Sequence, residues 1–382
     1  MEPFEYDKYV TGKYFVGRSQ DCRALGNLLA ASENVALYDA PKTGKTSVIR
    51  QALTDMQTEG RRLIIVKLNL IRFRDVNRFI TDFIASVLSA LGGTPDSFGS
   101  YIERYLPGSC FGYSFEEFEA GRCPVVCNGP LTDEDIAACF RFPDEVAKTL
   151  GQQMCIILNE FSTLLDADGG ERVMDIMEKV EAVRVKQPGE GACYIFCGSF
   201  LNAMKDIFEV KKRFYRCVEL LPLSPFEEKD VTEHIVKGFL ATGKSIERDL
   251  IHGPYTLFRG NMWYLNHLSA ICSSKSIGYI NSTILGDALS TIVSLHRPMF
   301  LRIISDLTDY QMSFVRAVLD GVVKLSAADV IERYGFNSSA NVKRLKDALM
   351  KKEIVSFNQK DEPYIIDPLF EHWLRNYYFC GR

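Results

Sequence analysis

Gly44, Lys45 and Thr46 have the types and the spacing of a phosphate-binding turn. The glycine lets backbone N–H groups face phosphate oxygens, the lysine neutralises charge on the β and γ phosphates, and the threonine hydroxyl is a ligand for Mg²⁺. The turn lies within "LYDAPKTGKTSVIRQAL", residues 37–53. The pattern therefore predicts binding of a nucleotide with Mg²⁺, and a fortuitous turn is the alternative.

The loop departs from the usual pattern at its first position, where Asp39 stands in place of glycine. This substitution adds a carboxylate near the phosphates, but binding rests chiefly on backbone N–H groups, Lys45 and Thr46. We therefore predict that the loop still binds nucleotide. The candidate residues of the loop are Asp39, Ala40, Pro41, Lys42, Thr43, Gly44, Lys45, Thr46 and Ser47.

The elements around the loop support this interpretation. The apolar run at 35–40 reads as a buried strand, and "TSVIRQALTDM" after the loop has helical spacing. Further buried strands are expected at 61–70, 153–161, 193–199 and 217–223, with helical segments between them. The alternation predicts an α/β fold with a five-stranded parallel sheet of the P-loop NTPase type.

The chain divides into three predicted domains. Residues 1–224 form the P-loop ATPase core, with an irregular insertion at about 96–140 that is rich in glycine, proline and aromatic residues. Helical patterns then replace strands, which predicts a helical lid over 225–306. Three helical segments and a hairpin over 307–382 predict a C-terminal winged-helix domain.

Several stretches together resemble the AAA+/STAND-type ATPases of archaea and Bacteroidetes, which are related to origin-recognition ATPases. They are "YFVGRSQDCRALGNLL", "APKTGKTS", "CIILNEFSTLL", "YIFCGSFLNAMKDIF", "RFYRCVELLPLSPF", "RGNMWYLNHL" and "YIIDPLFEHWLR". The resemblance runs from about 14 to 375 and rests on their order and spacing. It implies an ATPase core, a helical lid and a C-terminal winged helix.

The resemblance also implies a pair of acids at the end of the third strand. In such ATPases an aspartate holds the Mg²⁺ shell and a glutamate orients the attacking water; here the pair is Asn159 and Glu160. Asn159 takes the metal position and Glu160 the catalytic one. Hydrolysis should suffer more than binding, because metal positioning stabilises the transition state.

Further site residues follow from matching the family position by position. Phe15, Val16, Gly17 and Arg18 match the segment that packs around adenine, and a helix-entry loop is the alternative. Ser199 matches the polar sensor near the γ-phosphate, and a strand-end cap would look the same.

Two arginines and one substitution complete the comparison with the family. Arg213 and Arg216 lie where an arginine finger would read a neighbouring subunit's phosphate, although structural or solvated arginines are slightly favoured. Met262 stands where the lid motif usually has proline.

Composition narrows the class of protein. The 382 residues are 47% hydrophobic and 25% charged, with a formal charge of -4 that offers nucleic acid or anionic lipid no overall attraction. The 11 cysteines are an odd number and argue against a full disulfide framework, and Cys123 and Cys127 lack a ligand-spaced partner pair. The sequence shows no signal peptide or membrane-spanning run, so we expect a cytoplasmic protein.

The winged helix presents a basic stretch. A helix of this kind could enter a major groove, but acidic residues interrupt the run, so packing or contact with an unidentified protein is favoured over DNA. The basic residues are Lys343, Arg344, Lys346, Lys351 and Lys352.

The sequence predicts an ATP-binding molecular switch of the AAA+/STAND type with slow or impaired hydrolysis. One alternative is a competent Mg²⁺-dependent ATPase that uses Glu160, with Asp39 helping to hold the metal. The other alternative is a DNA-binding regulator that acts through the winged helix. The sequence is compatible with an oligomer, and it weakly favours adenine over guanine as the base of the nucleotide.

Overall fold

The structure is a computed structural model that describes residues 3–92 and 95–380. The outermost residues of the predicted first and third domains, 1–2 and 381–382, lie outside the described residues. The chain forms two compact units. The sheet unit comprises Ser19–Asp39 and Val48–Leu223, and the helical unit comprises Met1–Arg18, Ala40–Ser47 and Ser224–Arg382.

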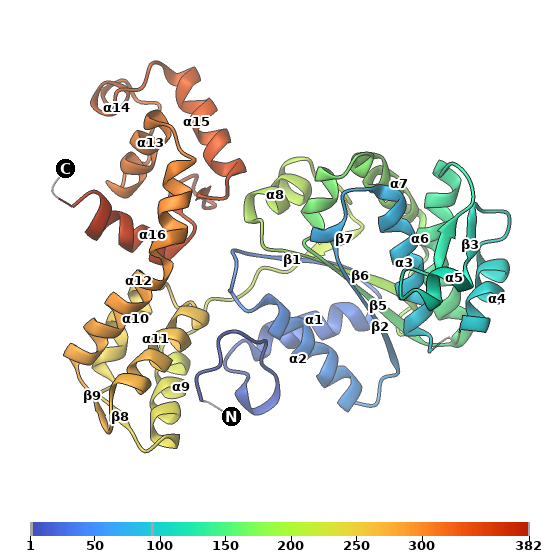
Figure 1. Cartoon of the computed structure of the whole chain (residues 1–382), viewed down its shortest axis with the longest axis horizontal. Coiled ribbons are helices and arrows are strands. Elements are labelled where there is room, and N and C mark those ends of the chain that lie inside the picture. Colours follow the sequence, from blue (N-terminus) through green and yellow to red (C-terminus); the bar gives the residue numbers. More distant parts are fainter. Residues whose placement is uncertain (1–2, 93–94, 381–382) are drawn as a thin grey trace. The chain divides into compact units, whose positions relative to one another are not determined.

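Five parallel strands form the sheet of the sheet unit, which confirms the predicted fold class (Figure 1). Their order is β2-β5-β6-β1-β7, so β2 lies at one edge. Their bounds are β1 Asn34–Tyr38, β2 Leu63–Asn69, β5 Gln153–Asn159, β6 Gly191–Gly198 and β7 Val218–Leu220.

The register of the sheet aligns the last residues of the three strands β1, β5 and β6. Tyr38 at the end of β1 lies opposite Gly198 at the end of β6, and Asn159 at the end of β5 lies opposite Cys197. Since the strands are parallel, their carboxyl ends meet at one edge, where ligands of open α/β sheets bind.

Helices cover both faces of the sheet (Figure 1). Alternate residues of β2, β5 and β6 pack into one apolar core with α3, α6 and α7, while α1 and α2 lie along the opposite face. Several large aromatic side chains of this core are fully buried, and they include Phe83, Phe140 and Tyr194. The helices are α1 Ser19–Ala30, α2 Lys45–Thr58, α3 Val76–Ala90, α6 Asp133–Leu150, α7 Gly170–Val183 and α8 Leu201–Lys205.

The segment expected to be irregular at about 96–140 contains regular elements. It includes α4 Pro95–Tyr105, β3 Phe111–Tyr113, α5 Phe115–Glu119 and β4 Val125–Cys127, and α6 begins at Asp133. Strands β3 and β4 pair as an antiparallel hairpin. Three-residue strands are too short to show an alternating pattern in the sequence, which is why periodicity missed them.

The lid region of the helical unit consists mainly of helices, as predicted. These are α9 Glu228–Ala241, α10 Asp249–Leu257, α11 Met262–Lys275 and α12 Ser282–Ser305. Two short strands, β8 Ser245–Ile246 and β9 Tyr279–Ile280, pair in parallel beside them.

The C-terminal part of the same unit has the three helices and hairpin expected of a winged helix. They are α13 Asp309–Leu319, α14 Ala328–Tyr334, α15 Ser339–Lys351, β10 Val355–Phe357 and β11 Pro363–Ile365, followed by α16 Pro368–Trp373. One apolar core joins this part to the lid helices. Within it the ring of Phe300 lies 5.2 Å from Phe370 and 5.5 Å from Trp373.

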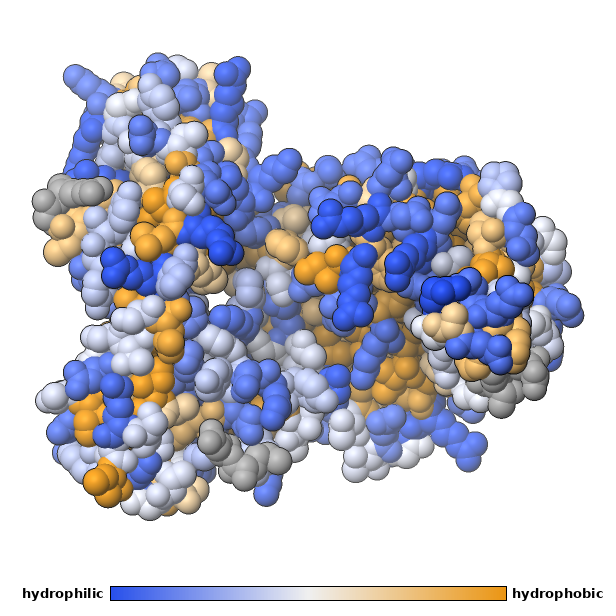
Figure 2. Space-filling view, viewed as in Figure 1, coloured by the Kyte–Doolittle hydropathy of each residue, from blue (hydrophilic) through white to orange (hydrophobic). Residues whose placement is uncertain are grey.

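Hydrophilic residues cover most of the visible surface of each unit (Figure 2). Within the described part of the chain, we find no helix with both the length and the apolar character needed to cross a membrane.

Candidate nucleotide-binding site

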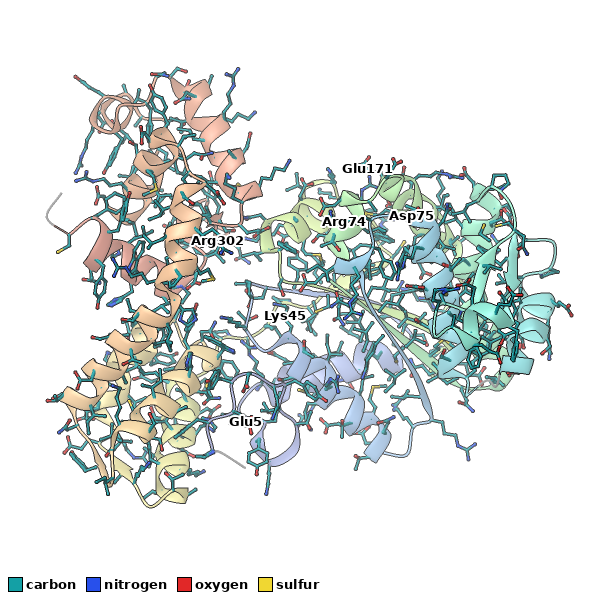
Figure 3. All side chains as sticks on the ribbon, viewed as in Figure 1. Glu5, Lys45, Arg74, Asp75, Glu171 and Arg302 are labelled. Atoms are coloured by element: carbon teal, nitrogen blue, oxygen red, sulfur yellow. The ribbon has the colours of Figure 1, made fainter. Side chains whose placement is uncertain are left out.

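The phosphate-binding loop runs from the residue after Asp39 into the first turn of α2, which begins at Lys45 (Figure 3). Gly44 has φ 92° and Lys42 has φ 66°. A glycine takes the left-handed conformation freely, whereas a lysine takes it at a cost. The helix that follows directs its first backbone N–H groups towards the loop, which is the arrangement that binds phosphate.

Lys45 is held inside the loop. Its ammonium donates a hydrogen bond to the carbonyl oxygen of Ala40 at 2.7 Å, and the Thr43 hydroxyl donates to the same oxygen at 3.0 Å. Lys45 is only 6% exposed. A phosphate that enters the loop must therefore compete with one backbone carbonyl for this ammonium group.

Arg18 braces the loop within the helical unit. Its Nε donates to the carbonyl of Ser224 at 2.8 Å, and its Nη1 donates to the carbonyl of Thr43. The guanidinium lies 4.1 Å from the ring centroid of Phe226, at the start of the lid region. Arg18 thus ties the loop to the segment that leads into α9, and the adenine contact of residues 15–18 stays a prediction.

Lys42 extends to the helical unit's own aromatic residues. Its ammonium lies 3.4 Å from the ring centroid of Trp263 and 5.5 Å from that of Tyr264, both at the start of α11. Burial lowers the pKa of Lys42, and the charge of Asp367 opposes that effect. The Tyr264 hydroxyl in turn donates to Asp367 at 2.8 Å. Sequence reasoning grouped Lys42 with the phosphate ligands and had no signal for these contacts.

The sheet unit brings together the predicted residues at its strand ends. The backbone N–H of Asp39 donates to the Gly198 carbonyl at 3.4 Å, next to Ser199. Glu160 has φ 55°, and its Oε2 accepts a hydrogen bond from the backbone N–H of Ser199 at 2.9 Å. The left-handed backbone turns the Glu160 side chain towards the end of β6. Asn159, Glu160 and Ser199 therefore meet at the carboxyl edge of the sheet, and the roles that the family resemblance gives them stay predictions.

The two predicted arginine fingers differ in their surroundings. Arg213 donates to the carboxylate of Asp175 and lies 3.8 Å from a carboxylate oxygen of Glu171, both on α7. Arg216 is exposed with φ 63°, and its guanidinium lies 5.2 Å from the ring centroid of Tyr215. Among the described residues we find no ion pair of Arg216. Arg213 is thus neutralised within its own unit, and the arginine-finger role of Arg216 stays a prediction.

The residues offered for Mg²⁺ have suitable chemistry but little charge. Thr46 supplies a hydroxyl from the loop, and Asn159 supplies an amide oxygen from the end of β5. Both are oxygen donors, which Mg²⁺ prefers, but neither adds the negative charge of an aspartate. In residues 3–92 and 95–380 no group of three or more His, Cys, Asp or Glu side chains is arranged to hold a metal ion. Any bound Mg²⁺ would depend on the phosphates for most of its negative ligands.

Comparisons with known proteins support the fold. Residues 298–376 match a family model described as a probable winged helix domain. The Walker-type ATPase Paby2304 of Pyrococcus abyssi is similar over 98% of this chain and 99% of its own, with 14% identity and a TM-score of 0.66. A structure of the Aeropyrum pernix ORC2 protein in ADPNP-ADP complexes covers 98% of this chain and 96% of its own, with 11% identity and a TM-score of 0.55. A search of curated proteins gave no match.

The chain therefore has the α/β fold of P-loop ATPases with a C-terminal winged-helix domain. Identities of 14% and 11% establish shared architecture, and the chemistry of this chain has to be argued from its own residues.

Proposed function

We propose that the protein is an ATP-binding molecular switch of the AAA+/STAND type whose hydrolysis is slow. One observation carries the proposal: the loop keeps Gly44, Lys45 and Thr46 at a helix start, while the end of β5 has Asn159 in place of a carboxylate. Binding depends on backbone N–H groups and Lys45, whereas turnover depends on metal positioning. The loop that binds nucleotide is thus intact, whereas the position that helps to hold the metal for hydrolysis is altered.

The position of Glu160 supports slow turnover. Its carboxylate accepts a hydrogen bond from the Ser199 backbone, and such charge-assisted bonds contribute about 1.5–3 kcal/mol. Orienting a water through Oε1 leaves this bond in place, whereas moving the whole side chain towards a water would break it. Glu160 is present and can serve as the base, so the proposal is slow hydrolysis and not a complete loss.

The contacts of the loop support a switch. Lys42 lies on Trp263, and the neighbouring Tyr264 donates to Asp367, directly before α16 of the winged-helix region. A nucleotide that changes the loop's conformation would act first on these contacts. A change of affinity for a partner requires that the partner distinguish the two conformations. We propose a protein partner over DNA, because the basic residues of α15 are partly engaged.

The engaged basic residues are Lys346 of α15 and Lys352, which directly follows this helix. The ammonium of Lys346 lies 3.7 Å from the ring centroid of Phe357 and 3.3 Å from a carboxylate oxygen of Asp361. Lys352 donates to the carbonyl of Asp306 at 3.2 Å. Two of the five basic side chains are thus turned towards the protein itself, which reduces the charge left for a phosphate backbone.

The test is phosphate release by Asn159→Asp. We expect the substitution to raise the rate of ATP hydrolysis and to leave ATP affinity within a few-fold, because the added charge acts on Mg²⁺ and the transition state. Asn159→Asp combined with Glu160→Gln should lose the gain. Asn27→Asp, on the exposed face of α1, is the matched control and should change neither quantity.

A different result would favour the competent-ATPase alternative. If the unmodified protein hydrolyses ATP at about 1 s⁻¹ or faster, and Asn159→Asp brings no increase, the proposal of slow turnover is wrong. Asp39→Gly then becomes informative, because it should lower turnover if Asp39 substitutes for the missing metal ligand.

A further inference from the structure

The edge strand β2 lines an open groove of about 1210 Å³ in the sheet unit. Five consecutive residues of β2, 65–69, line it. The side chains of Val66 and Leu68 are buried in the core at 1% and 4% exposure, so these residues present main chain to the groove. Among the described strands none pairs with the outer side of β2. The groove therefore borders a row of backbone donors and acceptors.

The opposite wall of the groove is a second strand edge. Residues 125–127 of β4 line it, and Val125 is only 2% exposed, so it too presents main chain. Strand β4 pairs with β3 on one side, and no described strand pairs with its other side. A groove between two unpaired strand edges has the hydrogen-bonding pattern that an extended peptide backbone complements.

Helix α3 forms the floor of the groove with small side chains. Phe79 and Phe83 point into the core, whereas Thr81, Ala85 and Ser86 line the groove. Because these side chains are short, they leave room beside β2. Figure 2 shows apolar surface in the region where Figure 1 draws β2 and β5, which fits contact with a partner's side chains.

The charged residues of the groove leave positive charge uncompensated. Asp82 lies 3.8 Å from Arg78, and Glu117 is paired with Arg122. The third acid, Asp75, caps α3 by accepting two backbone N–H bonds.

Lys67 and Arg72 have no ion pair among the described residues. Burial lowers the pKa of Lys67, and the nearby charge of Arg50 lowers it further. A carboxylate beside Lys67 would raise this pKa and so oppose both effects, which favours an acidic ligand here.

We propose that this groove binds an extended, acidic peptide segment of a partner protein, which adds a strand along β2. The strand has seven residues, and main-chain hydrogen bonds to its outer side would give affinity. Glutamate or aspartate side chains that reach Lys67 and Arg72 would give the preference for acidic sequences. The proposal does not depend on nucleotide binding, because none of the residues that line the groove is a candidate nucleotide or metal ligand.

The experiment uses the full-length chain and fluorescein-labelled peptides of about seven residues, the length that β2 can pair. One peptide alternates valine and glutamate, and a second alternates valine and lysine. Two further versions of the acidic peptide are methylated on alternate backbone nitrogens, one on each edge of the strand. Affinity is measured by fluorescence anisotropy, and hydrogen–deuterium exchange locates the site.

We expect the acidic peptide to bind at least about fivefold more tightly than the basic one. One methylated version should lose about tenfold or more, because only one edge of the peptide faces β2. Lys67→Glu and Ser86→Trp should weaken binding, the first by charge and the second by filling the groove. Ser100→Trp, on the exposed side of α4, is the control and should bind as the unmodified protein does.

Protection from exchange should appear at residues 65–69. The proposal is overturned if the acidic peptide shows no saturable binding up to about 1 mM, or if both methylated versions bind like their parent. It is also overturned if protection lies elsewhere in the chain. Tighter binding of single-stranded DNA than of the peptide, lost in Lys67→Glu, would instead make the groove a nucleic-acid site.

Discussion

The loop contains two lysines that the structure assigns to different tasks. Lys45 is held by the Ala40 carbonyl inside the loop, whereas Lys42 lies on the Trp263 ring. We predict that Lys45→Ala weakens ATP binding at least tenfold, about 1.4 kcal/mol, because the ammonium of Lys42, the other lysine of the loop, lies on the Trp263 ring. Lys42→Met should change ATP affinity by less than about threefold, or about 0.65 kcal/mol.

The cost of Lys42→Met should appear in stability. A cation over a tryptophan ring contributes about 0.5–2 kcal/mol, depending on how far water is excluded. Lys42 is exposed as a whole residue, which places its contribution at about 0.5–1 kcal/mol, and the methionine side chain recovers part of that by apolar contact. We expect a loss of up to about 1 kcal/mol in the free energy of unfolding of the helical unit.

The chain offers a direct assay for this comparison. It has two tryptophans, Trp263 and Trp373, and both belong to the helical unit. Tryptophan fluorescence during urea unfolding therefore follows that unit, and calorimetry measures ATP affinity separately. In Lys42→Met the native emission of Trp263 should also shift, because a charge is removed from its face.

Equal losses of ATP affinity in Lys42→Met and Lys45→Ala would refute the division of tasks. An unchanged native emission spectrum in Lys42→Met would show that the ammonium does not lie on Trp263 in solution. Lys13→Met serves as the control, because it removes an exposed lysine of the helical unit that lies outside the loop.

Three further predictions concern stability and DNA. Burial lowers the pKa of His267 to about 4, and the charge of His296 is the second cause. The free energy of unfolding of the helical unit should therefore fall as pH decreases from 6.5 towards 4, because the unfolded chain binds the proton more readily. Urea titrations at several pH values measure this slope, and His267→Gln should flatten it. Arg184→Met removes the cation that lies 2.7 Å from the buried carboxylate of Glu181, and it should lower the free energy of unfolding by about 3–5 kcal/mol. Adding Glu181→Gln should recover most of this loss, whereas additive losses in the double variant would contradict the pairing. The unmodified protein should bind random duplex DNA weakly near physiological salt, and tight binding abolished by changing the exposed Lys343 and Arg344 to Glu would reverse that expectation.

The strand-and-helix framework of the sheet could be predicted because its signals are local. Each of the five strands is a short apolar run bounded by turn residues, and their alternation with helices leads to a parallel sheet. The sequence also placed Asn159 and Glu160 at the end of one expected strand and Ser199 at the end of another, but it was the strand order that made these two strands neighbours. The insertion was predicted as irregular, and its strands β3 and β4 were missed because they are only three residues long.

The sequence by itself determined the chemistry that the site can hold. Gly44, Lys45 and Thr46 stand between an expected strand and an expected helix, and position 159 has asparagine where the related ATPases have aspartate. These are properties of residue types and of nearest neighbours along the chain, which folding does not change.

Only the tertiary structure decided what each charged side chain contacts. Lys42 meets Trp263 across 221 positions, Arg213 meets Asp175 across 38, and the unpaired edge of β2 exists because of the strand order. Such contacts depend on how distant segments pack, and a sequence pattern with a period of two or 3.6 residues carries no information about them. The structure therefore decided which lysine serves the phosphates and which positive charges are left for a partner.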